Sequence, residues 1–216
     1  MRSLSAPYTD RTDAGNRLAS ELLALKFTML PLVLAIPNGG VAVAIPIIKA
    51  LEAELDLIIV RKLQIPHNPE AGFGALTSLG SVMLNQPLVA QIGLSQPQID
   101  EVIRRTEQQI QRRQETYTHI VRNTTPKERL VILVDDGLAS GYTMLAAIAS
   151  VRTFNPKQII VAVPTGSPSA VKKVYPMVDK LICPHTPSGF IFAVADAYQH
   201  WYDVPDEEVL NLIETI

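Results

Sequence analysis

The sequence predicts an α/β fold in which helices cover both faces of a central parallel sheet. Short, continuously apolar runs recur along the chain, as in strands that are buried on both faces. Segments with helical spacing of apolar residues separate these runs, which is the pattern of right-handed βαβ units. Hydrophobic residues make up 47% of the 216 residues and charged residues 19%, so the chain can build one sizeable core.

Each predicted element is assigned from its local pattern. The strands are the short apolar runs at residues 32–36, 57–60, 130–134, 158–163 and 180–183. The helices are the segments in which apolar residues recur every three or four positions: 12–26, 41–55, 95–119, 144–151, 169–175 and 206–213. Pro46 is expected in the first turns of its helix, where a missing N–H group costs least.

Two regions depart from this alternation. Residues 63–76 are rich in Pro, Gly, Asn and His without a helical period, and they predict a long mobile loop. Residues 75–83 then predict a small hairpin that turns near Leu79 and Gly80. We expect a single domain over residues 1–216, with its core at about 28–183 and a small hood at about 184–216.

Charge and cysteine content restrict the class of protein. The net charge is -2 and the sequence pI about 6.1, so no basic excess points to a nucleic-acid partner. Cys183 is the only cysteine, which favours a reducing compartment. No apolar run reaches the roughly 20 residues of a membrane span, and the N-terminus lacks the apolar region of a signal peptide. We therefore expect a cytoplasmic protein without membrane association.

The segment 131–143 is the strongest candidate for a ligand site. Asp135 and Asp136 follow an apolar strand, at the end where open parallel sheets bind ligands. Small and hydroxylic residues then open a helix, where free N–H groups and the helix dipole favour an anion: Ala139, Ser140, Gly141, Tyr142 and Thr143. Carboxylates repel a phosphate that they touch, so the two acids point to sugar hydroxyls or a metal ion a few ångströms away.

Two other strand ends carry residues that suit an anion. Gly39 and Gly40 let backbone amides approach a ligand closely, and Arg61 and Lys62 supply positive charge. The carboxyl ends of parallel strands meet at one edge of a sheet, so we expect these residues to converge with Asp135. Each pair also has a plainer interpretation, as an ordinary strand-to-helix turn and as two solvated charges.

The run 131–143 resembles the motif that binds 5-phosphoribosyl-1-pyrophosphate (PRPP) in type I phosphoribosyltransferases. The similarity to this family, and to its uncharacterised predicted members, extends over nearly the whole chain and implies the type I fold. By position, it places Asp135 and Asp136 on the ribose hydroxyls and residues 139–143 on the 5′-phosphate. It assigns pyrophosphate to Asn38, Gly39, Gly40, Arg61 and Lys62, and it counts Lys62 with the two acids as catalytic. Asn38 stands where the similar proteins usually carry Arg, which removes one cation from this subsite.

The resemblance implies a glycosyltransferase that moves the phosphoribosyl group of PRPP to a nitrogen nucleophile, with a nucleobase as the expected acceptor, and releases pyrophosphate. Mg2+ is expected to be held through PRPP, with ligation by Asp135 or Asp136 as the alternative, and Phe190 is expected to stack on the base. Ala139 stands where hypoxanthine-guanine enzymes carry an aspartate, which disfavours a 6-oxopurine acceptor. A homodimer is also expected. Two alternatives stay open: a regulatory protein that binds PRPP or a nucleotide with little catalysis, and a Mg2+-dependent phosphoribosyl hydrolase.

Overall fold

A five-stranded parallel sheet forms the centre of the molecule, as predicted. The computed structural model describes residues 6–117, 122, 124–188 and 192–216. The strand order is β2-β1-β6-β7-β8, with every neighbouring pair parallel. The strands are β1 (Leu32–Ala35), β2 (Glu54–Leu57), β6 (Leu130–Val134), β7 (Gln158–Ala162) and β8 (Lys180–Ile182).

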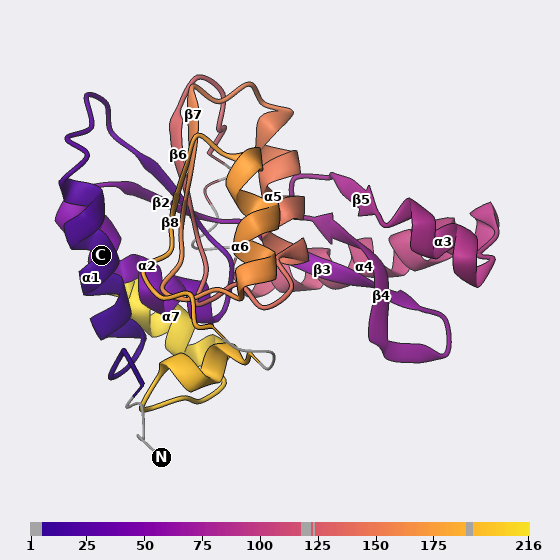
Figure 1. Ribbon diagram of the computed structural model, residues 1–216. Helices are drawn as coiled ribbons and strands as arrows, with labels where there is room; N and C mark the ends of the chain where they lie inside the picture. The colour runs from indigo at the N-terminus through magenta and orange to yellow at the C-terminus, as the bar shows by residue number, and fades with distance from the viewer. Residues whose placement is uncertain (1–5, 118–121, 123, 189–191) are drawn as a thin grey trace, which may run out of the picture.

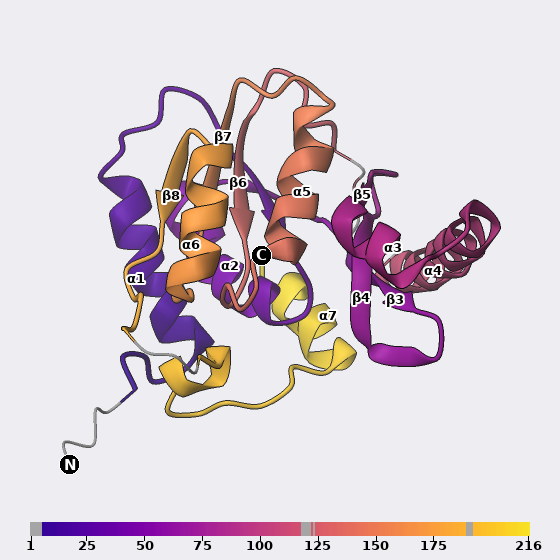
Figure 2. The same ribbon diagram turned by 45° about the vertical axis from the view of Figure 1, so that its right-hand side comes forward.

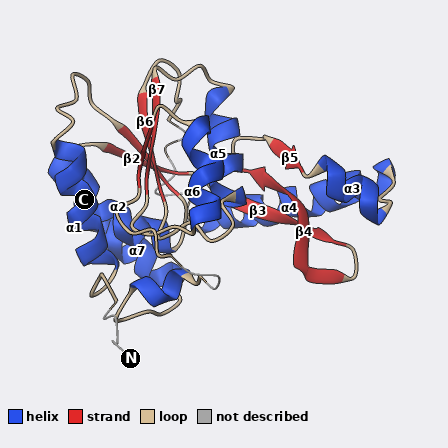
Figure 3. Ribbon diagram, viewed as in Figure 1, coloured by secondary structure: helices blue, strands red, loops and turns tan. Residues whose placement is uncertain are grey.

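Helices cover both faces of this sheet, which confirms the predicted layers (Figure 3). Alternate strand residues face opposite ways, so one set packs with α1 and α2 and the other with α5 and α6. These helices are α1 (Arg11–Leu23), α2 (Gly39–Leu51), α5 (Tyr142–Arg152) and α6 (Pro168–Val174), and α7 (Asp206–Glu214) lies against α2. Short 3₁₀ turns occur at Tyr175–Met177 and Val194–Ala197. No helix in the described ranges has the length and apolar character needed to cross a membrane.

A second unit, which we call the arm, projects from the parallel sheet (Figures 1 and 2). It comprises an antiparallel sheet, β3 (Val60–Ile65), β4 (Asn68–Thr77) and β5 (Val82–Leu84), with α3 (Gln86–Ile92) and α4 (Gln96–Thr116). The predicted hairpin at 75–83 is confirmed as the β4–β5 pair. The predicted loop at 63–76 is wrong, because most of this segment forms the β3–β4 hairpin.

Close packing explains why glycine-rich sequence forms strands here. A Cβ atom on Gly74 would lie 2.3 Å from the carbonyl oxygen of Met83 on the neighbouring strand. A Cβ atom on Gly72 would lie 2.2 Å from the Lys62 side chain, beside a register irregularity in the β3–β4 pair. Glycine therefore serves close approach between strands in the arm, although the same composition is typical of loops.

Two further local predictions are wrong. The apolar run 57–60 is not one strand, because β2 ends at Leu57 and β3 begins at Val60 in a different sheet. An unbroken apolar run gives no signal of such a change of sheet. Pro46 lies in the middle of α2, where Gly15 of α1 approaches so closely that a Cβ atom would be 3.0 Å from the Pro46 ring.

Candidate functional site

A cavity of about 520 Å³ lies at the carboxyl ends of β1 and β6, and we call it the charged cavity. Its lining includes three cationic and three anionic side chains: Arg11, Arg61, Arg113, Asp135, Asp136 and Asp203. Asn38, Gly39 and Thr143 line it as well. The structure therefore brings together most of the residues that the sequence assigned to ribose and pyrophosphate.

The two glycines at the start of α2 allow this helix to begin directly against the end of β6. A Cβ atom on Gly39 would lie 1.8 Å from Oδ2 of Asp136. A Cβ atom on Gly40 would lie 2.8 Å from the carbonyl oxygen of Val134 and 3.0 Å from Cα of Asp135. Gly40 is buried beneath the cavity and does not line it. Both glycines thus place the acids directly beside the Pro37–Gly40 turn, in which the Pro37–Asn38 peptide bond is cis.

Arg11, which the sequence did not single out, forms an ion pair with Asp136. Its Nε and Nη2 atoms lie 3.0 and 2.9 Å from Oδ2 of Asp136, and the side chain is only 5% exposed. The Arg11 guanidinium also lies 4.1 Å from the ring centre of Trp201, within range of a cation–π interaction. The Tyr198 hydroxyl donates a 2.6 Å hydrogen bond to the Asp136 carbonyl. These contacts fasten α1 and the predicted hood to the end of β6.

The two acids differ in their electrostatic surroundings. Burial raises the pKa of Asp135 well above its ordinary value, and the neighbouring charge of Asp136 raises it further. Burial also raises the pKa of Asp136, but the Arg11 guanidinium opposes this rise. Asp135 receives a 2.8 Å hydrogen bond from the backbone N–H of Asp136. A carboxyl with so little compensating charge favours a ligand that donates hydrogen bonds or brings a cation.

Residues 139–143 form the loop before α5 and the first two residues of this helix, and all of them except Gly141 are exposed. Gly141 has a φ of 81°, in the left-handed region that favours glycine, and its carbonyl accepts the hydrogen bond of the first helical turn. Within the described part of the chain, the hydroxyls of Ser140 and Thr143 have no hydrogen-bond partner. Exposed hydroxyls and the positive end of the helix dipole together suit an anion such as phosphate.

Hydrogen bonds with the segment that follows β7 hold residues 138–139, at the start of this loop, in place. The Ser167 hydroxyl donates a 2.7 Å hydrogen bond to the Ala139 carbonyl, and the Leu138 N–H donates one of 2.9 Å to the Thr165 carbonyl. Ser167 and Thr165 were missed at the sequence level. A usable signal was present, because both are polar residues just after a buried strand.

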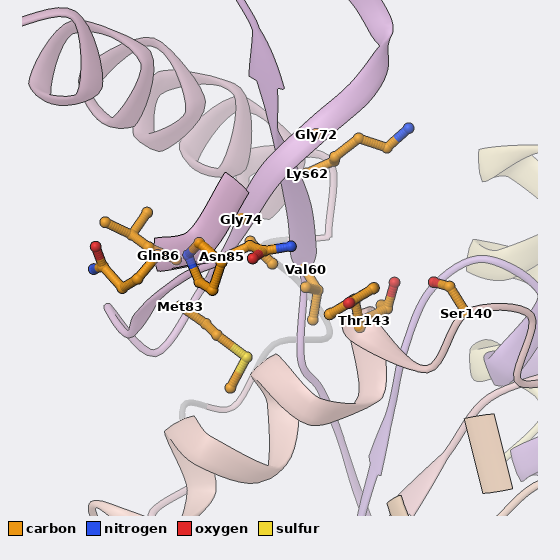
Figure 4. A pocket seen from close by; sticks show the side chains of 13 residues that line it. Val60, Lys62, Gly72, Gly74, Met83, Asn85, Gln86, Ser140 and Thr143 are labelled. Atoms are coloured by element: carbon orange, nitrogen blue, oxygen red, sulfur yellow. The ribbon is translucent and has the colours of Figure 1, made fainter. Parts of the chain in front are cut away.

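A second cavity, of about 600 Å³, lies between the arm and residues 139–143, which we call the phosphate loop after the ligand that the sequence predicts for them. We call this second cavity the arm cavity (Figure 4). Its walls are largely apolar, with Val60, Ala75 and Met83 among them, whereas Ser140 and Thr143 supply hydroxyls at one side. Lys62 lines the arm cavity, although Arg61 beside it lines the charged cavity, because successive strand residues point to opposite faces. The structure therefore separates two cations that the sequence placed together, and Phe190 lies outside the described residues.

The donor set allows a test of whether Mg2+ fits. In residues 6–117, 122, 124–188 and 192–216, no group of three or more His, Cys, Asp or Glu side chains is arranged to hold a metal ion. Mg2+ commonly binds through one or two carboxylates and completes its shell with waters and substrate phosphates. Asp135 and Asp136 fit that mode of binding.

Comparison with known proteins agrees with this geometry. The family model described as "Phosphoribosyl transferase domain" matches residues 8–199. Two Mycobacterium tuberculosis relatives, from strains CDC 1551 and H37Rv and each named "Putative phosphoribosyl transferase", are 35% identical over 207 residues. The match covers 96% of this chain and 46% of each relative, so the chain spans about half their length.

Solved structures show the same fold. The crystal structure of TT1426 from Thermus thermophilus has a TM-score of 0.81 and 33% identity, and the match covers 95% of this chain and 97% of that one. The AQ2163 protein from Aquifex aeolicus has a TM-score of 0.50 and 12% identity over 82% of this chain and 73% of that one, a likeness in fold alone. By its sequence match and its architecture, the chain belongs to the phosphoribosyl transferase family.

Proposed function

We propose that this chain transfers the 5-phosphoribosyl group of PRPP to a nitrogen nucleophile and releases pyrophosphate. The observation that carries the proposal is the charged cavity, where Asp135 and Asp136 lie between the Pro37–Gly40 turn and the phosphate loop. A sugar bound on the acids would have its 5′-phosphate near residues 139–143 and its pyrophosphate near Gly39 and Arg61. One molecule of PRPP thus accounts for all three groups of residues.

In this reaction the nitrogen lone pair forms a bond to ribose C1 while the C1–oxygen bond to pyrophosphate breaks. The electron pair of that bond leaves with pyrophosphate, and the proton of the nitrogen is released to solvent. Asp135 and Asp136 would orient the ribose through its hydroxyls, and the phosphate loop would anchor the remote end, so that binding energy is converted into alignment. Arg61, Asn38 and Gly39 would bind the departing pyrophosphate, whereas Gly40, which does not line the cavity, would only shape the turn.

Mg2+, when bound with PRPP, would neutralise part of the pyrophosphate charge. Lys62 has a different position from Arg61, because it lines the arm cavity beside Ser140 and Thr143. Its predicted role at the pyrophosphate requires the flexible lysine side chain, or the arm itself, to move toward the charged cavity. A nucleobase is the proposed acceptor, and Ala139 favours one that is not a 6-oxopurine.

The test is to incubate the protein with PRPP, Mg2+ and a panel of nucleobases and small amines while pyrophosphate release is followed. Release that depends on one acceptor supports the transferase. Ribose 5-phosphate formed without any acceptor identifies a hydrolase instead, and PRPP binding without turnover identifies a regulatory protein. The Asp135→Asn/Asp136→Asn double variant is the control, because the proposed site loses both of its acids.

A further inference from the structure

Arg113 connects three elements that are far apart in the sequence. It lies in the last turn of α4, and its side chain is 22% exposed. One guanidinium nitrogen donates to Oδ1 of Asn38 and the other forms an ion pair with Asp206 at the start of α7. The Tyr117 hydroxyl lies 3.1 Å from Oδ1 of Asn38 and 3.1 Å from Oδ1 of Asp206. The α4 helix thus reaches across from the arm to the Pro37–Gly40 turn.

Asn38 and Asp206 are also joined by a side-chain hydrogen bond. The Asn38 side-chain amide donates to Oδ1 of Asp206 at 2.9 Å and to the Val204 carbonyl at 2.7 Å. Burial works against ionisation of Asp206, but hydrogen bonds from Asn38 and Arg113 lower its pKa below the ordinary value. Asp206 therefore stays ionised and fixes the Arg113 guanidinium in place.

The fixed guanidinium faces the charged cavity. Arg113 lines that cavity with Asn38, Gly39 and Arg61, whereas Asp206 does not line it. Of the other two arginines in the lining, Arg11 is paired with Asp136, which lines the cavity itself, whereas the carboxylate that pairs with Arg113 lies outside the lining. An arginine carries five N–H donors in a rigid fork, so two contacts on one side leave donors for a ligand on another.

Position 38 itself is uncharged, although it belongs to the turn assigned to pyrophosphate. A diphosphate with several negative charges needs fixed cations near that turn. We propose that Arg113, held by Asn38 and Asp206, is a pyrophosphate-binding residue of this site and supplies the positive charge that Asn38 lacks. This inference rests on the proposed function, because it assumes that pyrophosphate binds beside Gly39.

The chain offers a matched control for the test. Arg112 precedes Arg113 on the same helix and is exposed to solvent, so Arg112→Ala makes the same change of charge outside the cavity. Calorimetric titration with inorganic pyrophosphate and Mg2+ is expected to show about tenfold weaker binding for Arg113→Ala, the loss of roughly one charged contact. Arg112→Ala should remain within about twofold of the unchanged protein.

Titration with ribose 5-phosphate separates a direct contact from a structural effect. This ligand carries the ribose and 5′-phosphate but no pyrophosphate, so Arg113→Ala should bind it as the unchanged protein does. Equal loss of both ligands would overturn the inference and assign Arg113 a structural role. Unchanged pyrophosphate binding by Arg113→Ala would also overturn it, whereas failure of the unchanged protein to bind pyrophosphate would count against the proposed function itself.

Discussion

The charged cavity and the arm cavity adjoin at Val60 and Thr143, which line both, but their other lining residues differ in charge and polarity. The charged cavity has arginines and aspartates held by ion pairs and close backbone contacts at the ends of parallel strands. The arm cavity has many apolar residues on an antiparallel sheet and hydroxyls at one side, and its lining also includes Lys62 and the amides of Asn85 and Gln86. This difference indicates that the first is organised in advance for a highly charged ligand, whereas the second has room for a less polar group.

The largest expected effect concerns the ion pair that stabilises the charged cavity. Arg11→Ala leaves Asp136 without its cation and removes the contacts with Trp201 and the Tyr202 carbonyl. Breaking a buried pair in this way should lower the free energy of unfolding by about 3 kcal/mol. Denaturant unfolding followed by circular dichroism measures this loss of stability.

Met83→Ala is the matching change in the arm cavity, where the side chain is only half-buried. Its expected cost is about 1 kcal/mol or less. If the two variants lose the same stability, the charged cavity is not the more rigidly organised of the two.

Arg61 and Lys62 provide a test with adjacent residues on one strand. Arg61 lines the charged cavity and Lys62 lines the arm cavity. Removing each cation in turn therefore shows which cavity binds pyrophosphate. Arg61→Ala should weaken pyrophosphate binding about tenfold, and Lys62→Ala only about twofold. Calorimetry with pyrophosphate and Mg2+ decides the order, and a larger loss for Lys62→Ala would show that the arm moves over the site.

A smaller effect, of opposite sign, is expected from Asp135. Its pKa in the folded protein lies above the unfolded value of about 3.9, so ionisation destabilises the fold as the pH rises through that interval. Asp135→Asn removes this penalty and should raise the free energy of unfolding at pH 7 by on the order of 1 kcal/mol.

The gain from Asp135→Asn should disappear below about pH 4, where the carboxyl is protonated in the folded and the unfolded chain alike. Thermal unfolding between about pH 3 and pH 8 shows the trend. Asp203→Asn, which removes a carboxylate from an exposed position of the same cavity, is the control. A loss of stability at pH 7 in Asp135→Asn would mean that the ionised form is stabilised in the fold.

The parts of the fold that could be predicted are those that depend on local sequence. The buried strand 130–134 and the motif that follows it are continuous in the chain, so a pattern of residues specifies both. The β3–β4 hairpin of the arm could not be predicted, because Gly72 and Gly74 act through contacts with neighbouring strands that no local pattern specifies. Arg113 is one of several arginines on a polar helix, and no local signal sets it apart from Arg112. Its contact with Asn38 exists only after α4, α7 and the β1 end have packed together.

The roles of the individual site residues are predictions that a measurement of ligand binding can test. Titration of the protein with PRPP and Mg2+ in a calorimeter, beside the Asp135→Asn/Asp136→Asn double variant, tests the central claim most directly. The account predicts saturable binding by the unchanged protein and a loss of about 100-fold or more in the double variant, as expected when a sugar loses two charged hydrogen-bond acceptors. Equal PRPP affinity in the two proteins, or no binding by the unchanged one, would contradict it.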